Sequence, residues 1–110
     1  MERSQVAADY TTVVNAEGKY VEVSDTFCKL VGYSREELIG KPYSELTAPD
    51  TTDIQATFSI FLREGYMQGL WMLLHRDGTH ILIRYESWVR PDCFIESRME
   101  LVNRDLEKSA

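Results

Sequence analysis

Hydrophobic and polar residues alternate along two stretches of the chain, one near its start and one beyond its middle. In TTVVNAEGKYVEV, residues 11–23, two short β-rich runs flank a turn at Gly18, which predicts a hairpin. A longer hairpin is predicted in GLWMLLHRDGTHILIRYESWVR, around Asp77-Gly78. The stretch CFIESRMELVN predicts a last strand up to about Asn103, although residues 97–108 also contain good helix formers.

Short helices are predicted between the two hairpins. Ser24 or Asp25 can cap the first helix, which carries Phe27 and Leu30 on one side and ends at Gly32. Helices of one or two turns do not persist alone in water. Packing against another element must therefore hold this helix in place.

The next helix begins with the capping box in SREELIG, formed by Ser34 and Glu37. We expect Leu38 and Ile39 to be its buried pair and Gly40 to be its end. This helix is also too short to be stable by itself.

A longer helix follows, with Asp50 as its expected N-cap and Gly65 as its end. Its apolar face has the spacing i, i+4, i+7 and i+8, and comprises Ile54, Phe58, Phe61 and Leu62. The predicted order is two strands, three or four helices and three strands.

Composition and charge narrow the classes of function. The 110 residues suffice for one domain, and 44% hydrophobic with 27% charged residues is ordinary globular composition. A net charge of −6 without a basic cluster argues against nucleic acid and anionic membranes as partners. The sequence contains neither a long apolar run nor a signal-peptide core, and Cys28 and Cys93 fit no metal or redox spacing, so we expect a reduced, cytoplasmic protein.

The segment NAEGKYVEVSDTFCKLVGYSREELIGKPYSEL resembles the first half of a PAS domain. The usual sequence motifs of that half are a D-x-x-G-x-I turn, N-x-A-F and L-G-Y-S-x-E-E-L-I-G-K. HRDGTHILIRYES is similar to the R-K-D-G-S hairpin of that family, and VNRDLEK to its closing D-I-T-E-R. The resemblance covers roughly Thr11 to Lys108. It implies an α+β fold, a five-stranded antiparallel sheet with short helices covering one face.

The resemblance also implies how the chain is organised. The PAS domain would occupy residues 11–104, after a flanking segment, residues 1–10, whose composition permits a helix. A connector helix would begin in residues 105–110, and the ending at Ala110 suggests that this helix is cut short.

The loop of the second hairpin decides which side chains face the helices. In the family this loop usually has three residues, here Arg76-Asp77-Gly78. The inward side chains would then be Trp71, Leu73, Ile81, Ile83 and Tyr85. The outward side chains would be Leu82, Arg84, Glu86 and Trp88.

Two hypotheses for function follow from this register. In the first, the domain senses a small, mostly apolar molecule in a pocket whose candidates are Phe27, Leu30, Leu38, Phe58, Phe61, Trp71, Leu73, Ile83, Tyr85, Met99 and Asn103. The alternative is that these side chains only fill a core without ligand. In the second, the outer face of the sheet forms a homodimer through Leu70, Met72, Leu74, Leu82 and Trp88, because so large an apolar patch is rarely left in water.

No cofactor or metal is expected. Flavin-binding relatives carry a G-x-N-C-R-F-L-Q string, which is missing here, and two asparagines at positions that correspond to Leu73 and Ile83, although Asn103 matches a glutamine of theirs. Haem-binding relatives take a histidine from the long helix, which has none here. His75 and His80 would face each other as a metal pair only across a two-residue loop.

The sequence also predicts that the chain is not an enzyme, because it contains no triad and no phosphate loop. Asp50 and Asp53 suit the first turn of a helix, and Cys28 suits a core. The resemblance implies a regulatory module that relays a signal to a C-terminal output domain. Asp105 would orient the connector, although Glu107 replaces the family's threonine.

Overall fold

The computed structural model describes residues 7–48 and 54–104 of the chain. The expected helix cap Asp50 and the expected relay residue Asp105 lie outside the described residues, as does most of the flanking segment 1–10.

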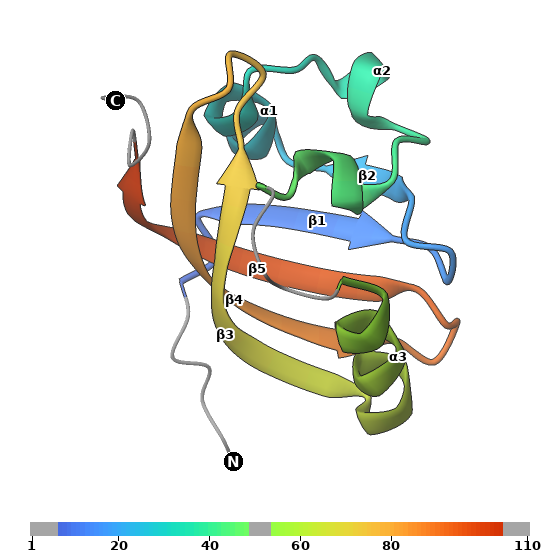
Figure 1. Cartoon of the computed structure of the whole chain (residues 1–110). Helices are drawn as coiled ribbons and strands as arrows, with labels where there is room; N and C mark the ends of the chain where they lie inside the picture. Colours follow the sequence, from blue (N-terminus) through green and yellow to red (C-terminus); the bar gives the residue numbers. More distant parts are fainter. Residues whose placement is uncertain (1–6, 49–53, 105–110) are drawn as a thin grey trace.

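A five-stranded antiparallel sheet in the order β2-β1-β5-β4-β3 is the framework of the molecule (Figure 1). This arrangement confirms the predicted fold class. The first residue of the sheet is Tyr10, one position before the expected domain boundary. The strands are β1 (Tyr10–Val14), β2 (Tyr20–Val23), β3 (Tyr66–Leu74), β4 (His80–Val89) and β5 (Ile95–Arg104).

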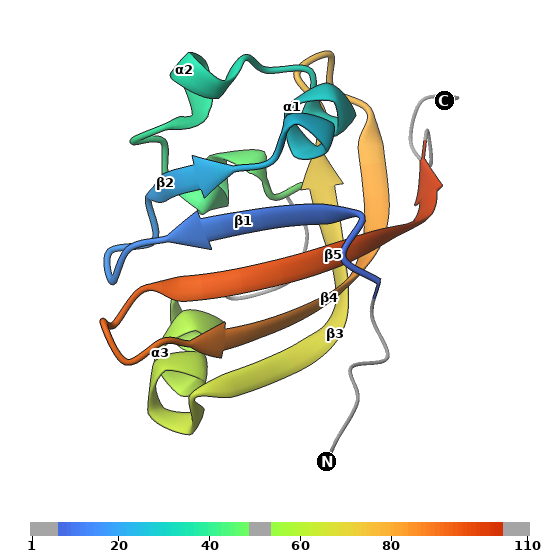
Figure 2. The ribbon, with the colours of Figure 1, turned by 180° about the vertical axis from the view of Figure 1, so that it is seen from behind.

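The helices lie on one side of this sheet, between β2 and β3 in the chain (Figure 1). In the view from behind, β4 passes in front of the longest helix (Figure 2). The helices are α1 (Asp25–Val31), α2 (Arg35–Leu38), the 3-10 helix η1 (Tyr43–Leu46) and α3 (Ile54–Glu64). In the described part of the chain no helix is long and apolar enough to cross a membrane.

Both N-caps of the short helices and the glycine end of α1 are as the sequence predicts, whereas α2 ends at Leu38, two residues before the expected Gly40. The Ser24 hydroxyl accepts a hydrogen bond from the Phe27 N–H at 3.1 Å, and Gly32 ends α1 in the left-handed region. In α2, the Ser34 hydroxyl accepts from the Glu37 N–H at 3.1 Å, and the Glu37 carboxylate accepts from the Ser34 N–H at 2.9 Å. The capping box is therefore complete.

Two residues predicted to be buried are exposed. Ile39 is 43% exposed because α2 ends at Leu38 and the backbone of Ile39 is already extended, which takes its side chain off the helix face. Leu62 is 42% exposed because the buried stripe of α3 follows Phe58 and Phe61, and Leu62 lies one residue around the helix from it.

The β3–β4 hairpin has the three-residue loop that the resemblance implied. The His75 N–H donates to the Thr79 carbonyl at 2.8 Å, and Gly78 takes a φ of 93°. Leu73 accordingly pairs with Ile81. In this register the alternation of side chains sends His75 and His80 to opposite faces of the hairpin, which excludes them as a facing pair.

This loop is docked on the turn between α1 and α2. The Arg76 N–H donates to the Val31 carbonyl at 2.9 Å. The Arg76 guanidinium binds both carboxylate oxygens of Glu37, at 2.8 and 3.0 Å, and lies over the Tyr33 ring. The guanidinium lowers the pKa of the Glu37 carboxyl below its ordinary value, with help from the Ser34 N–H.

Residues 95–104 form a strand along their whole length, so the helical alternative is wrong for residues 97–103. β5 pairs with β1 on one side and with β4 on the other. Its register against β4 shifts once: Ile83 pairs with Leu101, but Leu82 pairs with Asn103. Val102 is therefore an extra residue, a β-bulge in β5.

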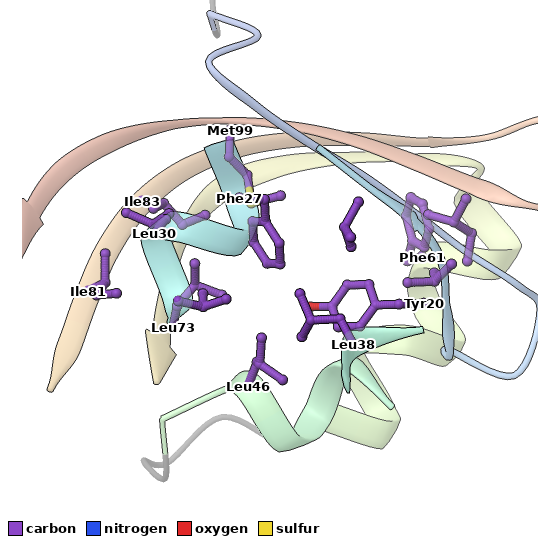
Figure 3. Close-up of a cluster of buried hydrophobic side chains, with 14 residues drawn as sticks. Tyr20, Phe27, Leu30, Leu38, Leu46, Phe61, Leu73, Ile81, Ile83 and Met99 are labelled. Carbon is purple, nitrogen blue, oxygen red and sulfur yellow. The ribbon is translucent and has the colours of Figure 1, made fainter. Parts of the chain in front are cut away.

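A cluster of apolar side chains fills most of the space between the sheet and the helices (Figure 3). Burying one large aliphatic or aromatic side chain contributes about 1.5–3 kcal/mol, so this cluster is what holds the short helices on the sheet. Its largest fully buried members are Phe27, Val31, Leu38, Leu46, Ile81 and Ile83.

Candidate functional site: an interior cavity over the sheet

The packing between sheet and helices leaves a cavity of about 110 Å³. The sheet supplies most of its lining, namely Thr12, Val14, Tyr20, Met67, Trp71, Leu73, Ile83, Tyr85, Ser87, Ile95, Ser97 and Met99. The helical side supplies Tyr43, Phe58 and Phe61. The cavity therefore lies between the centre of the sheet and the segment from η1 to α3.

Four aromatic rings form a continuous wall of this cavity. Tyr43 lies between Phe58 and Trp71, with ring centroids 5.6 and 6.3 Å away, and Tyr85 meets Trp71 edge to face at 5.9 Å. The Trp71 indole N–H donates to the Thr47 hydroxyl at 3.0 Å, which fixes the orientation of the ring. Such ring pairs stabilise a fixed arrangement by about 0.5–1.5 kcal/mol each.

A row of hydroxyl groups crosses the middle of the apolar sheet face. Thr12, Ser97 and Ser87 are neighbours on β1, β5 and β4, and all three line the cavity. The Oγ atoms of Ser87 and Ser97 lie 2.6 Å apart, within hydrogen-bond distance. The sheet therefore presents neutral hydrogen-bonding groups to an otherwise apolar space.

Three tyrosines add their phenol groups to the lining. Burial raises the pKa of Tyr20 far above its ordinary value, with a smaller effect from nearby Tyr43. Burial also raises the pKa of Tyr43 to about 12, and that of Tyr85 in the same direction. All three phenols are consequently neutral at physiological pH.

The structure brings together most, but not all, of the predicted pocket residues. Those that line the cavity are Phe58, Phe61, Trp71, Leu73, Ile83, Tyr85 and Met99. Phe27, Leu30 and Leu38 belong to the surrounding buried cluster instead. Asn103 is exposed and pairs with Leu82, because the bulge at Val102 takes it out of the inward register.

Several lining residues were missed by sequence reasoning. Ser87 and Ser97 continue the inward alternation of Tyr85 and Met99, so the same register would have found them. Tyr20 could have been found in the same way, from the alternation of side chains along the short strand β2. Tyr43 has none, since it lies in a 3-10 turn without periodicity.

The predicted dimer residues lie on the opposite face of the sheet. Leu70 is 56% exposed, and the other four, Met72, Leu74, Leu82 and Trp88, are partly exposed. The face also contains polar groups: the Tyr66 hydroxyl donates to Glu86 at 2.6 Å, and the Arg98 guanidinium lies over the Trp88 ring. Glu86 is buried although its side chain points outward.

No metal site is present among the residues that the structure describes, where no three His, Cys, Asp or Glu side chains form a suitable group. Cys28 is half-buried and Cys93 is exposed, and neither forms a disulfide.

The fold and the site together define a class of domain: a curved antiparallel sheet with short helices and a cavity on its concave face. Comparison with known protein families identifies this class. The model of the PAS family, described as the PAS fold, matches residues 4–86. The chain therefore belongs to the PAS family. The comparison with curated proteins gives no match.

Solved structures of PAS domains share this fold. A domain of a sensory box sensor histidine kinase/response regulator from Geobacter sulfurreducens is 21% identical, with a TM-score of 0.75 over 86% of this chain and 83% of that chain. The PAS domain of an HTR-like protein from Haloarcula marismortui is 21% identical, with a TM-score of 0.72 over 86% and 81%. The blue-light photoreceptor Aureochrome1 LOV is 18% identical, with a TM-score of 0.76 over 88% and 84%.

Proposed function

We propose that this chain is a non-catalytic sensory module of a signal-transduction protein, and that a small, mostly apolar molecule in the interior cavity sets its state. The observation that carries the proposal is the cavity of about 110 Å³ inside a PAS fold, walled by four aromatic rings. Among the described residues that line it, none is a carboxylate, an imidazole or a thiol, which argues against catalysis. The likeness to a domain of a sensor histidine kinase supports a signalling role.

In this proposal the outer face of the sheet transmits the signal by forming a homodimer. The apolar side chains there, Leu70 above all, support that role because a monomer would leave them in water. A C-terminal output domain would receive the signal through the connector that begins at Asp105.

A second candidate is a dimerisation domain whose core is filled and which binds no ligand. The small cavity favours this candidate, since pockets for drug-sized molecules usually measure about 300–1,000 Å³. Cavity occupancy therefore decides between the two.

Native mass spectrometry of the protein as purified reports bound mass and subunit number together. The proposal expects a dimer with a small organic molecule bound, and an absorption spectrum without a flavin or haem band. A ligand-free dimer that takes up no small molecule would favour the second candidate. A stoichiometric flavin, haem or metal ion would overturn both.

A further inference from the structure

The sheet ends in two edge strands, β2 and β3, and the chain itself closes the edge at β2. The Tyr20 N–H donates to the Lys41 carbonyl, and the Tyr20 carbonyl accepts from the Gly40 N–H. The Arg35 guanidinium donates to the Val23 carbonyl at 3.0 Å. Such closure matters because an edge strand with an open backbone can pair with another chain.

The outer edge of β3 is closed near the C-terminal end of the strand. Residues of an antiparallel strand alternate in direction, and the Gly65 carbonyl accepts from the Val89 N–H of β4's end. Every second residue from Gly65 therefore faces β4, and the residues between them direct their N–H and carbonyl groups away from it. The Ala48 N–H agrees with this pattern, since it donates to the outward Met72 carbonyl at 2.9 Å.

Gln68 and Leu70 leave the middle of this edge open. Each directs an N–H and a carbonyl away from β4, and within residues 7–48 and 54–104 these groups have no hydrogen-bond partner. Both side chains are exposed on the outer face, with Leu70 56% exposed. Both views show β3 as the outermost strand (Figure 1, Figure 2). The open groups have the spacing with which an added strand pairs.

The composition of β3 does nothing to prevent such pairing. Its nine residues, YMQGLWMLL, contain neither a charged side chain nor proline, which are the usual means of protecting an edge strand. Gly69 lies between the two open residues, and glycine within a strand often marks a place where another backbone comes close. The strand is therefore suited to accept a further strand.

The size and charge of the open stretch limit the partner. A stable interface between two folded proteins usually buries about 1,200–2,000 Å². The backbone groups of two residues and one exposed leucine are a much smaller contact, which suits an extended segment better than a second copy of this domain. The net charge of −6 favours a basic segment, because opposite charges speed association and stabilise the complex.

We propose that the open edge of β3 at Gln68 and Leu70 binds an extended, basic segment of a partner protein, which joins the five-stranded sheet as a sixth strand. The segment would place an apolar side chain beside Leu70 on the outer face and carry Lys or Arg on either side of the paired residues. This inference goes beyond the proposed sensory function, because it adds a partner at the edge of the sheet.

The test is a titration of the isotope-labelled protein with a blocked peptide, KKTVTVTVKK, at pH 7 and low salt, followed by heteronuclear NMR and amide hydrogen exchange. In the free protein the amides of Gln68 and Leu70 should exchange rapidly. Saturating peptide should slow both at least about tenfold, as one hydrogen bond each implies. The acidic peptide EETVTVTVEE should bind at least about tenfold more weakly. Absence of binding, unprotected amides at saturation, or equal affinity for both peptides would overturn the inference.

Gln68→Pro removes one N–H from the open edge and keeps the bonds between β3 and β4, because that N–H points away from β4. It should weaken binding of the basic peptide at least about tenfold. Gln68→Lys should also weaken binding, by charge repulsion, so the test does not depend on proline being tolerated. Leu82→Gln is the matched control, because Leu82 lies on β4, away from the edge, and should leave the affinity unchanged. Parent affinity in both Gln68 variants, or an equal loss in Leu82→Gln, would contradict binding at the edge.

Amide exchange of the free protein also identifies any other occupant of the edge. Gln68 and Leu70 amides that are protected at every protein concentration would show that the chain closes this edge itself. Protection that develops only as the protein concentration rises would show that a second copy occupies it. Either result would overturn this inference and leave the proposed sensory function standing.

Discussion

Gly32 ends α1 in the left-handed region with the imidazole ring of His75 directly against it. A Cβ atom at Gly32 would lie 2.6 Å from His75 Cε1, whereas at Gly40, also left-handed, it would meet nothing within 4 Å. Alanine at either position should cost about 1–2 kcal/mol of backbone strain. Gly32→Ala should cost about 1 kcal/mol more, because His75 must move and release the Asp77 N–H that it accepts at 3.0 Å.

Urea denaturation of both variants measures this difference in the free energy of unfolding. In a protein that already carries His75→Ala, the additional change Gly32→Ala should cost only the backbone strain. Equal destabilisation by Gly32→Ala and Gly40→Ala would mean that His75 moves aside freely.

The buried tyrosines make stability depend on alkaline pH. In the unfolded chain a tyrosine loses its proton near pH 10, whereas burial raises the pKa of Tyr43 to about 12 and that of Tyr20 still further. Above pH 10 the unfolded state therefore binds fewer protons than the folded state. The stabilisation is complete below pH 10, and the free energy of unfolding should fall between about pH 10 and 12.

Each fully buried phenol can contribute up to about 1.4 kcal/mol per pH unit to this decline. Urea denaturation at several pH values between 8 and 11 measures the slope, and Tyr20→Phe should make it shallower. An identical slope in the variant would show that the Tyr20 phenol ionises equally well in both states.

Among the elements, α2 depends most on its cap, because four residues form a single turn. Ser34→Ala removes the hydroxyl that accepts from the Glu37 N–H and should cost about 1 kcal/mol. Ser44→Ala is a matched control, since Ser44 is exposed in η1, which has no side-chain cap. Chemical denaturation should separate the two variants, and similar losses would argue against a specific capping effect.

The elements that the sequence predicted best are those with a local chemical signal. Gly18 and Gly78 marked the hairpin turns, and Ser34 with Glu37 marked α2. The three-residue loop then placed Trp71 and Tyr85 on the cavity side correctly, because side chains in a paired strand must alternate.

The site was predicted less completely, for physical reasons that differ from residue to residue. Asn103 was misplaced because an extra residue in β5 changes the register without any signature in the sequence. Tyr43 owes its place to contacts distant in the chain, including the bond from its N–H to the Gly18 carbonyl.

For the whole molecule, we predict self-association through the outer face of the sheet. Leu70→Glu should convert a dimer to a monomer in sedimentation experiments without unfolding the chain, and Leu82→Glu should weaken the dimer. Leu62→Glu is the matched control, because Leu62 is similarly exposed but lies on α3, on the other side of the sheet. A monomeric parent protein would contradict this prediction and favour coverage of the face by residues 1–10.

The bulge at Val102 also determines toward which face of the sheet the residues after it point. A strand turns each successive side chain by about 180°, so one extra residue exchanges the two faces for everything after it. Arg104 consequently pairs with Ile81, although in an unbulged strand it would occupy an outward position. This single residue therefore sets how any segment joined to β5 is rotated about the axis of the strand. Deleting Val102 would turn that segment half-way round while leaving the cavity lining in register.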